Sequence, residues 1–198
     1  MFLERVLVGS HHVRSKNSHR YHSVGLTKVF VVSTVDVDEG LRELQQLAKN
    51  SRKPAENVKE VWIHLGVHGG AHCVHLEQCA YNDISFRVPD ERGYQPPLRT
   101  PIVTESDGTT SPVVDALSTS VPVEKMCRVV PLTKHSVDPG RFLCNYIYFR
   151  SLLATAGRSD ADALFVHVPP FSRIPQGKQV ELLSRLLHCI AESVVQPV

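Results

Sequence analysis

Two side chains in the second half of the sequence have the chemistry of a nucleophile and its base. Cys144 follows the turn Asp138-Pro139-Gly140 and lies in the first turn of a predicted helix, where aligned peptide dipoles favour a thiolate anion. His167 ends the apolar run Ala163–Val168, and the carboxyl ends of buried strands are where α/β sheets bind ligands. The pair could act as nucleophile and general base. Each residue alone also has an ordinary explanation as a buried structural group.

Glu77 could complete such a site. It lies in the predicted strand Cys73–Ala80, where alternation places its carboxylate on the face opposite Leu76 and on the same face as His75. A carboxylate there could accept the second N–H of His167 and so fix the orientation of the imidazole. A solvated strand face would explain Glu77 equally simply, because spacing in the sequence does not show the contact.

A cluster of imidazoles and thiols raises a second hypothesis, a zinc site. Its members are His64, His68, His72, Cys73, His75 and Cys79. Gly69-Gly70 disfavours the helix that would bring residues four apart together, and no Cys-x-x-Cys motif is present, so zinc is disfavoured. The glycine pair also lacks the spacing of a phosphate-binding or dinucleotide-binding loop. Nucleotide binding is therefore disfavoured.

Composition limits the remaining classes of function. A chain of 198 residues with 42% hydrophobic content suits one domain with a sizeable core, and a net charge of +2 gives no reason to expect nucleic acid or anionic membrane as partner. No apolar stretch is long enough to span a bilayer. Five irregularly spaced cysteines favour reduced thiols and the cytoplasm. The basic start of the chain, residues 1–28, leaves a transit peptide as an alternative.

Strand and helix patterns alternate along the rest of the chain. The expected elements are strands at Val29–Val32, Val58–Val67, Cys73–Ala80 and Ala163–Val168, and helices after Asp38, at Val123–Val130, from Leu143 to Ala156 and at Val180–Val194. Such alternation predicts an α/β fold, a single-domain three-layer α/β/α sandwich with a mostly parallel sheet. Residues 1–28 are expected to be weakly ordered, and residues 29–198 to form the domain. The proline-rich stretch 88–122 is expected to lie on the substrate side.

Several motifs occur in an order that resembles the pyroglutamyl peptidase I (pyrrolidone-carboxylate peptidase) family, over about two-thirds of the chain between Val61 and Ala191. The matching segments are Leu65-Gly66-Val67-His68-Gly69-Gly70, Leu76-Glu77 to Asn82, Arg87-Val88-Pro89-Asp90, Gly140-Arg141-Phe142-Leu143-Cys144-Asn145 and Phe165-Val166-His167-Val168-Pro169. In the middle loop, Gly93, Gln95-Pro96, Pro101-Ile102, Asp107-Gly108 and Leu117-Ser118-Thr119 resemble bacterial members.

The resemblance implies a cysteine peptidase that removes N-terminal pyroglutamyl residues from peptides without a cofactor. It implies a Cys-His-Glu triad of Cys144, His167 and Glu77. It also implies substrate-binding roles for Gly66 and Val67 through their backbones, for Arg87 as a nearby positive charge, and for Val88, Phe142 and Leu143 as pocket walls. Pyroglutamyl peptides are then the expected partners, and assembly into homo-oligomers is compatible with this interpretation.

The start of the chain departs from the family pattern. Family members open with a strand leading into a Gly-Phe-Gly-Pro-Phe loop whose aromatic rings cover the pyroglutamyl ring, and Ser10-His11-His12-Val13 offers no such residues. Pro139 also replaces a small residue before Gly140, and the interval from Met126 to Cys144 is a few residues shorter. One explanation is a fragment or a misassigned start of an active enzyme. The other is a catalytically impaired homologue that serves as a binding or regulatory protein.

Overall fold

The fold is built around one six-stranded sheet. The computed structural model describes residues 5–16, 20–51, 58–104 and 114–195. The strands of the sheet, in spatial order, are β2 (Arg20–Val31), β1 (Arg5–Lys16), β3 (Val58–Val67), β8 (Ala161–Val168), β4 (Val74–Glu77) and β7 (Thr133–Ser136). The pairs β3–β8 and β4–β7 are parallel, whereas β1 is antiparallel to β2 and β3, and β4 is antiparallel to β8.

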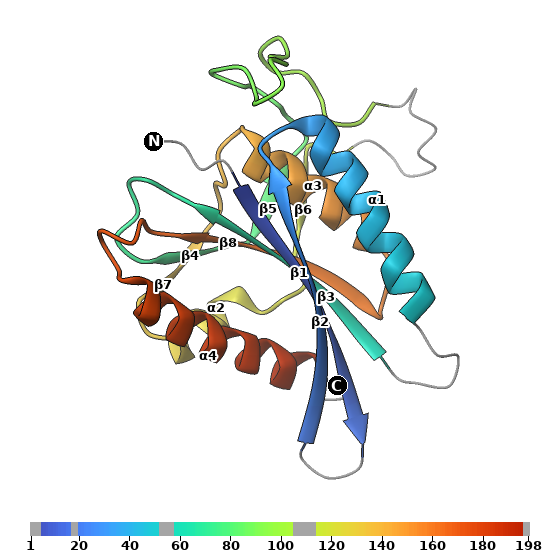
Figure 1. The fold of residues 1–198 in the computed structure, drawn as a ribbon, viewed down its shortest axis with the longest axis vertical. Coiled ribbons are helices and arrows are strands. Elements are labelled where there is room, and N and C mark those ends of the chain that lie inside the picture. Colours follow the sequence, from blue (N-terminus) through green and yellow to red (C-terminus); the bar gives the residue numbers. More distant parts are fainter. Residues whose placement is uncertain (1–4, 17–19, 52–57, 105–113, 196–198) are drawn as a thin grey trace.

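The structure describes two strands, β1 and β2, in the segment 1–28 for which weak order was predicted, while residues 1–4 and 17–19 lie outside the described residues. β1 and β2 form an antiparallel hairpin that extends beyond the neighbouring strands in Figure 1. β1 also pairs with β3, from Leu7 opposite Leu65 to Arg14 opposite Val58. The prediction of weak order is therefore corrected for these strands. Its physical basis was the lack of an apolar period, but backbone hydrogen bonds to strands on both sides do not depend on that period.

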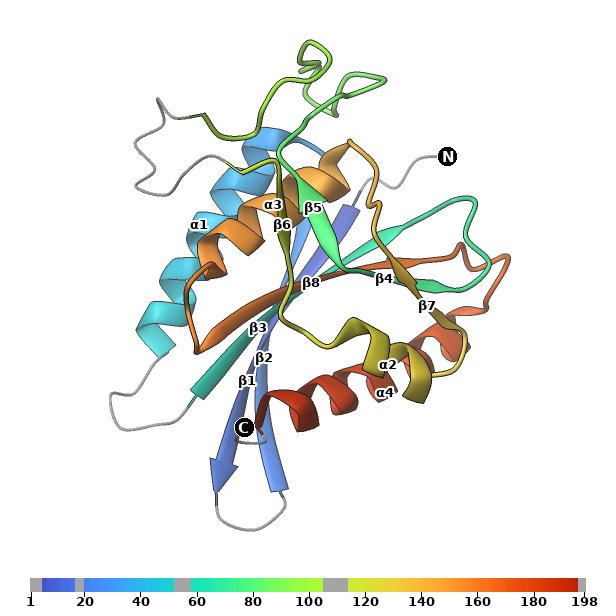
Figure 2. The same ribbon diagram turned by 180° about the vertical axis from the view of Figure 1, so that it is seen from behind.

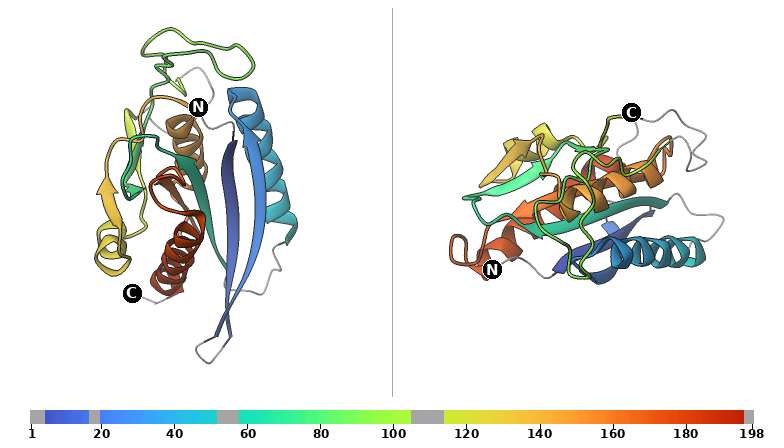
Figure 3. Two further views of the ribbon diagram at one scale, coloured as in Figure 1. Left: turned by 60° about the vertical axis from the view of Figure 1, so that its left-hand side comes forward. Right: turned by 90° about the horizontal axis from the view of Figure 1, so that it is seen from above.

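Helices cover both faces of the sheet, as predicted for an α/β sandwich. They are α1 (Thr34–Ser51), α2 (Val123–Val129), α3 (Leu143–Thr155) and α4 (Gln176–Val195). One core cluster joins α1 and α3 to Trp62 and Phe165, and the other joins α2 and α4 to Ile63 and Leu164. Because adjacent strand residues face opposite sides, these two clusters lie on opposite faces. In the side view of Figure 3, α1 and α4 flank the sheet.

The first helix begins four residues earlier than Asp38 suggested. Ser33 caps it by accepting a hydrogen bond from the backbone N–H of Asp36 at 3.1 Å. Asp38 instead lies inside the helix, where it accepts a hydrogen bond from the Tyr146 hydroxyl at 2.9 Å. This bond ties α1 to α3. A serine three residues before an aspartate is a helix-start signal of its own.

The predicted strand Cys73–Ala80 is divided into two elements. β4 ends at Glu77, and β5 (Cys79–Tyr81) pairs with β6 (Ala116–Ser118) in a separate two-stranded sheet, visible from behind in Figure 2. The backbone N–H of Gln78 bonds the carbonyl of Ser136 at 2.7 Å, and its carbonyl accepts from Thr119 at 3.0 Å. The chain therefore changes sheets at Gln78. Among the described residues, no helix is long and apolar enough to cross a membrane.

Candidate active site

A row of residues across the sheet brings the predicted site together. The strand register places Gly66 of β3, His167 of β8 and His75 of β4 side by side, with Lys134 of β7 next in the row. Residues directly opposite one another on neighbouring strands share a face. The face in question carries Phe165, which packs in the same core cluster as α3. Helix α3, which carries Cys144, therefore lies above this row.

His167 and Glu77 form the contact that the sequence could only suggest. The Nδ1 atom of His167 lies 2.8 Å from Oε1 of Glu77, although 90 residues separate them in the chain. Both side chains are buried, with 5% and 0% of their surfaces exposed. The second carboxylate oxygen, Oε2, has no hydrogen-bond partner among the described residues. The side chain of Glu77 therefore hydrogen-bonds the imidazole, and this contact leaves Nε2 of His167 facing away from the carboxylate.

Cys144 approaches the same row of residues from α3, because its sulfur would lie 3.2 Å from a Cβ atom on Gly66, the residue opposite His167. It is the second residue of α3, where the helix dipole favours an anion. Burial opposes protonation of His167, but hydrogen bonds to Cys144 and Glu77, together with their negative charges, raise its pKa to about 9. An imidazole with a pKa of about 9 remains protonated at neutral pH. His167 therefore carries a proton that it could donate, with the Glu77 side chain against its Nδ1 atom.

Gly66 leaves the space that the thiol occupies. A Cβ atom at this position would lie 3.2 Å from the Cys144 sulfur and 2.8 Å from Cζ of Phe165. The second distance is shorter than any relaxed carbon contact, so a side chain at Gly66 would displace the aromatic ring or the thiol. The close approach of β3 to α3 therefore requires glycine here.

Asn145 holds the start of α3 against the neighbouring strand β5. Its side chain accepts a hydrogen bond from the Tyr81 backbone N–H at 2.8 Å and donates to the carbonyls of Tyr81 and Asp83 at 2.8 and 2.9 Å. The residue is fully buried. Three bonds from one buried side chain fix the position of the helix turn that carries Cys144.

The residues expected to bind substrate have different surroundings. Phe142 precedes α3 and packs edge-to-face on Phe86, with ring centroids 4.7 Å apart. Leu143 is 1% exposed and belongs to the core, which leaves it little surface to offer as a pocket wall. Val67 is half-buried at the end of β3, beside Gly66. Arg87 and Val88 are exposed on the loop after β5, and their roles remain predictions.

Several residues that support the site were not singled out from the sequence. The Tyr148 hydroxyl donates to the Glu77 carbonyl at 2.7 Å, and burial raises the pKa of Tyr148 well above its usual value. The ring of Phe165 lies 4.7 Å from that of His167. Tyr148 is four residues after Cys144 and therefore on the same side of α3. The spacing of four residues from Cys144 could have pointed to Tyr148, but in an apolar helix several other residues also lie on the side of Cys144.

Two further histidines surround the catalytic candidate. The His68 ring lies 5.6 Å from that of His167 and 5.2 Å from that of His75. Burial, with Lys134 next in effect, lowers the pKa of His75 to about 4, so that it is neutral at pH 7. His64 instead bonds the Ser151 hydroxyl at 2.7 Å. Within the described ranges no group of three potential ligands is arranged to hold a metal ion, so the structure gives the zinc hypothesis no support.

Comparisons with known proteins identify relatives over most of the chain. Residues 31–184 match the family model described as pyroglutamyl peptidase. Human pyroglutamyl-peptidase 1 is 30% identical over 139 residues, which cover 67% of this chain and 59% of the human protein. Human pyroglutamyl-peptidase 1-like protein is 29% identical over 171 residues, covering 80% of this chain and 78% of that protein. The chain thus spans about three-fifths of the length of human pyroglutamyl-peptidase 1.

A solved structure has the same fold. Pyrrolidone carboxyl peptidase from Thermococcus litoralis superposes with a TM-score of 0.66 at 20% identity, covering 82% of this chain and 76% of that one. β1 and nearly all of β2 precede the segment that the family model matches. Because that match covers well over half of the 198 residues, the chain belongs to the pyroglutamyl peptidase family.

Proposed function

We propose that this protein is a cysteine peptidase that removes N-terminal pyroglutamyl residues from peptides, with Cys144 as nucleophile, His167 as acid and base, and Glu77 as the group that orients His167. The observation that carries the proposal is the buried 2.8 Å contact between His167 and Glu77. The Cys144 sulfur lies at the same place, 3.2 Å from where a Cβ atom of Gly66 would be, and Gly66 is the residue opposite His167 on β3. Membership of the family supplies the substrate class.

The first half of the reaction forms a thioester. The Cys144 thiolate attacks the carbonyl carbon of the pyroglutamyl residue, and the carbonyl oxygen becomes an oxyanion. The Nε2–H of His167 then gives its proton to the peptide nitrogen, because Nδ1 is engaged with Glu77. The carbon–nitrogen bond breaks and the shortened peptide leaves as an amine. Cys144 now carries the pyroglutamyl group.

The second half releases the acid. His167, neutral after the first step, accepts a proton from a water molecule, and the water oxygen attacks the thioester carbonyl. The carbon–sulfur bond then breaks, which frees pyroglutamate and restores the thiolate beside the imidazolium. Glu77 stabilises the imidazolium at both stages, since its buried carboxylate lies against Nδ1.

We assign recognition of the lactam ring to residues around the Cys144 thiol. Backbone groups of Gly66 and Val67 are proposed to hydrogen-bond the lactam, and Phe142 and Val88 to contact its apolar side. Arg87 is proposed as a positive neighbour. A neutral cyclic amide suits backbone hydrogen bonds and apolar walls, whereas a charged free amino terminus would lose its hydration without compensation.

The test is hydrolysis of a fluorogenic pyroglutamyl arylamide by the full chain in a buffer containing a thiol reductant. Wild-type protein is expected to release the fluorophore, while Cys144→Ser and His167→Ala release none above background. Cys189→Ser, which changes another half-buried thiol on α4, is the matched control and should retain full activity. Unchanged turnover by Cys144→Ser would exclude the assigned nucleophile.

The alternative, an impaired homologue with a binding or regulatory role, predicts a different result. In that case the folded wild-type chain fails to release the fluorophore while an active family member succeeds in the same buffer. Alkylation then adds a second readout: a Cys144 that reacts no faster than the other four thiols lacks activation and supports the alternative.

We also propose that the protein works in a reducing compartment such as the cytoplasm. All five cysteines are free thiols in the structure, namely Cys73, Cys79, Cys127, Cys144 and Cys189. Thiolate catalysis requires the reduced form, which the cytosol maintains. Imaging of the tagged full-length protein tests this, and secretion or import into an oxidising compartment would contradict it.

A further inference from the structure

Two turns at the carboxyl ends of β3 and β8 form a surface beside His167. The first turn comprises residues 68–73 and the second comprises residues 169–175. The backbone N–H of His68 donates to the Val168 carbonyl at 2.9 Å, which joins the turns at their start. The Nη1 atom of Arg173 lies 3.3 Å from Nδ1 of His72, which joins them again further out. The two turns therefore form one continuous surface.

This surface carries basic groups and no acidic ones. Residues 68–73 read His-Gly-Gly-Ala-His-Cys and residues 169–175 read Pro-Pro-Phe-Ser-Arg-Ile-Pro, without Asp or Glu. His68, His72 and Arg173 are exposed. Arg173 forms no ion pair with a carboxylate in the part of the chain that the structure describes. Its positive charge is therefore available to a ligand.

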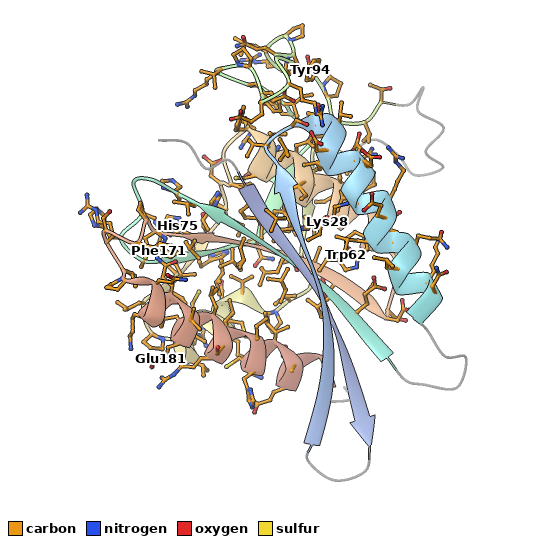
Figure 4. The ribbon with its side chains drawn as sticks, in the orientation of Figure 1. Lys28, Trp62, His75, Tyr94, Phe171 and Glu181 are labelled. Carbon is orange, nitrogen blue, oxygen red and sulfur yellow. The ribbon has the colours of Figure 1, made fainter. Side chains whose placement is uncertain are left out.

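The surface borders the atom that protonates the leaving group. The His68 ring lies 5.6 Å from the His167 ring, edge to face, and is exposed where His167 is buried. A peptide amine released at His167 must pass groups that surround this imidazole. The second turn also presents Phe171, 59% exposed, which lies on the same side of the molecule as His75 in Figure 4. The leaving peptide thus has a polar and apolar surface to contact.

We propose that the turns 68–73 and 169–175 bind the leaving part of the substrate and select pyroglutamyl peptides that carry a carboxylate in the first two residues after the scissile bond. This inference rests on the proposed function. Arg173 is the specificity-determining residue, because its guanidinium is a planar fork that matches a carboxylate. An extended peptide advances about 3.3–3.6 Å per residue, so two leaving residues reach farther than the 5.6 Å that separates the rings of His167 and His68.

The experiment compares three substrates that differ only in the side chain of the last residue. They are pyroglutamyl-alanyl-glutamate amide, pyroglutamyl-alanyl-glutamine amide and pyroglutamyl-alanyl-lysine amide, whose side chains are negative, neutral and positive. At low salt the wild-type kcat/KM is expected to decrease in that order, with the glutamate substrate about threefold to fivefold better than the glutamine one, as for an exposed ion pair. In 1 M salt the Debye length falls to about 3 Å, and the preference is expected to disappear.

Arg173→Gln should reduce kcat/KM for the glutamate substrate to the level of the glutamine substrate, while leaving the glutamine substrate unchanged. His72→Gln, which keeps a hydrogen-bonding side chain but not a titratable one, should reduce the preference partly. Arg42→Gln, which removes an exposed cation on α1, away from the two turns in Figure 1, is the matched control for net charge and should retain the full preference.

The outcomes separate this inference from the proposed function. If wild-type protein cleaves none of the three substrates, the proposed peptidase activity fails. If it cleaves all three at the same rate, the peptidase activity stands and the carboxylate preference is wrong. A preference that Arg42→Gln removes as fully as Arg173→Gln would assign the effect to overall charge and overturn the role of these turns. Circular dichroism of each variant verifies that it is folded.

Discussion

Two acidic side chains, Cys144 and Glu77, favour the protonated form of His167. Burial alone would favour the neutral imidazole, yet the hydrogen bonds and negative charges of Cys144 and Glu77 outweigh it and raise the pKa of His167 to about 9. A protonated His167 is required to release the peptide amine in the proposed reaction. The same contacts that stabilise the ion pair therefore set the upper pH limit of activity.

Glu77→Gln tests this dependence. Replacing a carboxylate with a neutral amide removes a negative charge beside the imidazolium, so the pKa of His167 falls and the alkaline limit of kcat/KM moves to lower pH, by about one unit. Activity at pH 7 is expected to drop by at least about tenfold, but not to vanish, because nucleophile and base remain. A pH profile from 6 to 10 measures both effects. Glu91→Gln, an exposed charge change, should leave the profile unaltered.

Gly66→Ala tests the close approach of β3 to the thiol. The added methyl group would meet Cζ of Phe165 at 2.8 Å and the Cys144 sulfur at 3.2 Å. Accommodation requires one of them to move, which should lower kcat at least about tenfold and stability by about 1–3 kcal/mol. Urea unfolding and arylamide turnover measure the two quantities. Gly69→Ala is the matched control, because nothing lies within 4 Å of its new methyl group. This variant is expected to have wild-type activity.

The sequence predicted the residues of the site better than their contacts. Cys144 and His167 were singled out from a helix start and a strand end, and Glu77 from strand alternation; the resemblance to a family joined them as a triad, and their catalytic roles stay predictions. Strand alternation correctly placed Glu77 on the face of His75. The pairing of β4 with β8, which brings Glu77 to His167, joins residues 90 positions apart. No local pattern specifies which strands become neighbours, so the sequence did not predict that His68 and His75 lie beside His167.

At the scale of elements, the loop after β5 is positioned by its attachment to α1. Asp90 accepts hydrogen bonds from the N–H and hydroxyl of Thr34 at 3.0 and 3.3 Å. Its other oxygen accepts from the backbone of Arg92 and Tyr94 at 3.0 and 2.9 Å. One buried carboxylate thus helps to cap α1 and closes the turn of the loop. The loop carries Arg87 and Val88, the proposed substrate contacts.

Asp90→Ala is expected to loosen this loop. Loss of the cap and of the buried acceptor should lower the free energy of unfolding by about 2 kcal/mol or more. Amides of residues 84–104 should exchange faster with solvent. KM for the arylamide should rise more than kcat falls, since the three residues of the proposed triad are unchanged. Glu91→Ala changes the exposed neighbour and serves as control. Unchanged exchange rates in Asp90→Ala would show that the loop has other supports.

Strand and helix positions were predictable where the apolar pattern was strong. β3 was predicted with the bounds observed, Val58–Val67, and α3 differs from the prediction by one residue. β4 and β5 were predicted as one strand, because Gln78 is compatible with a continuous extended chain and its role in changing sheets depends on hydrogen bonds to Ser136 and Thr119. Hydrogen bonds between distant segments decide such breaks, and local propensity does not include them.

At the scale of the whole molecule, β1 occupies an interior position in the sheet. It lies between β2 and β3 and is antiparallel to both. The residues of this strand lack a sustained apolar period, which is why the sequence predicted weak order. A strand bonded on both edges gains a full set of backbone hydrogen bonds whatever its side-chain pattern. β1 therefore continues the sheet between the strand that leads into α1 and the strand that carries Gly66.

Gly9→Pro tests whether β1 is integral to the fold. Gly9 pairs with Thr27 on one side and Ile63 on the other, so a proline here removes a ladder hydrogen bond from an interior strand. We expect the free energy of unfolding to fall by roughly 2–4 kcal/mol and the amides of β3 to lose exchange protection. Gly177→Pro is the control, because the first turn of α4 tolerates proline. If both variants are equally stable and the amides of β3 keep their exchange protection, then β1 contributes little to the sheet. The stable part of the fold would then begin at β2.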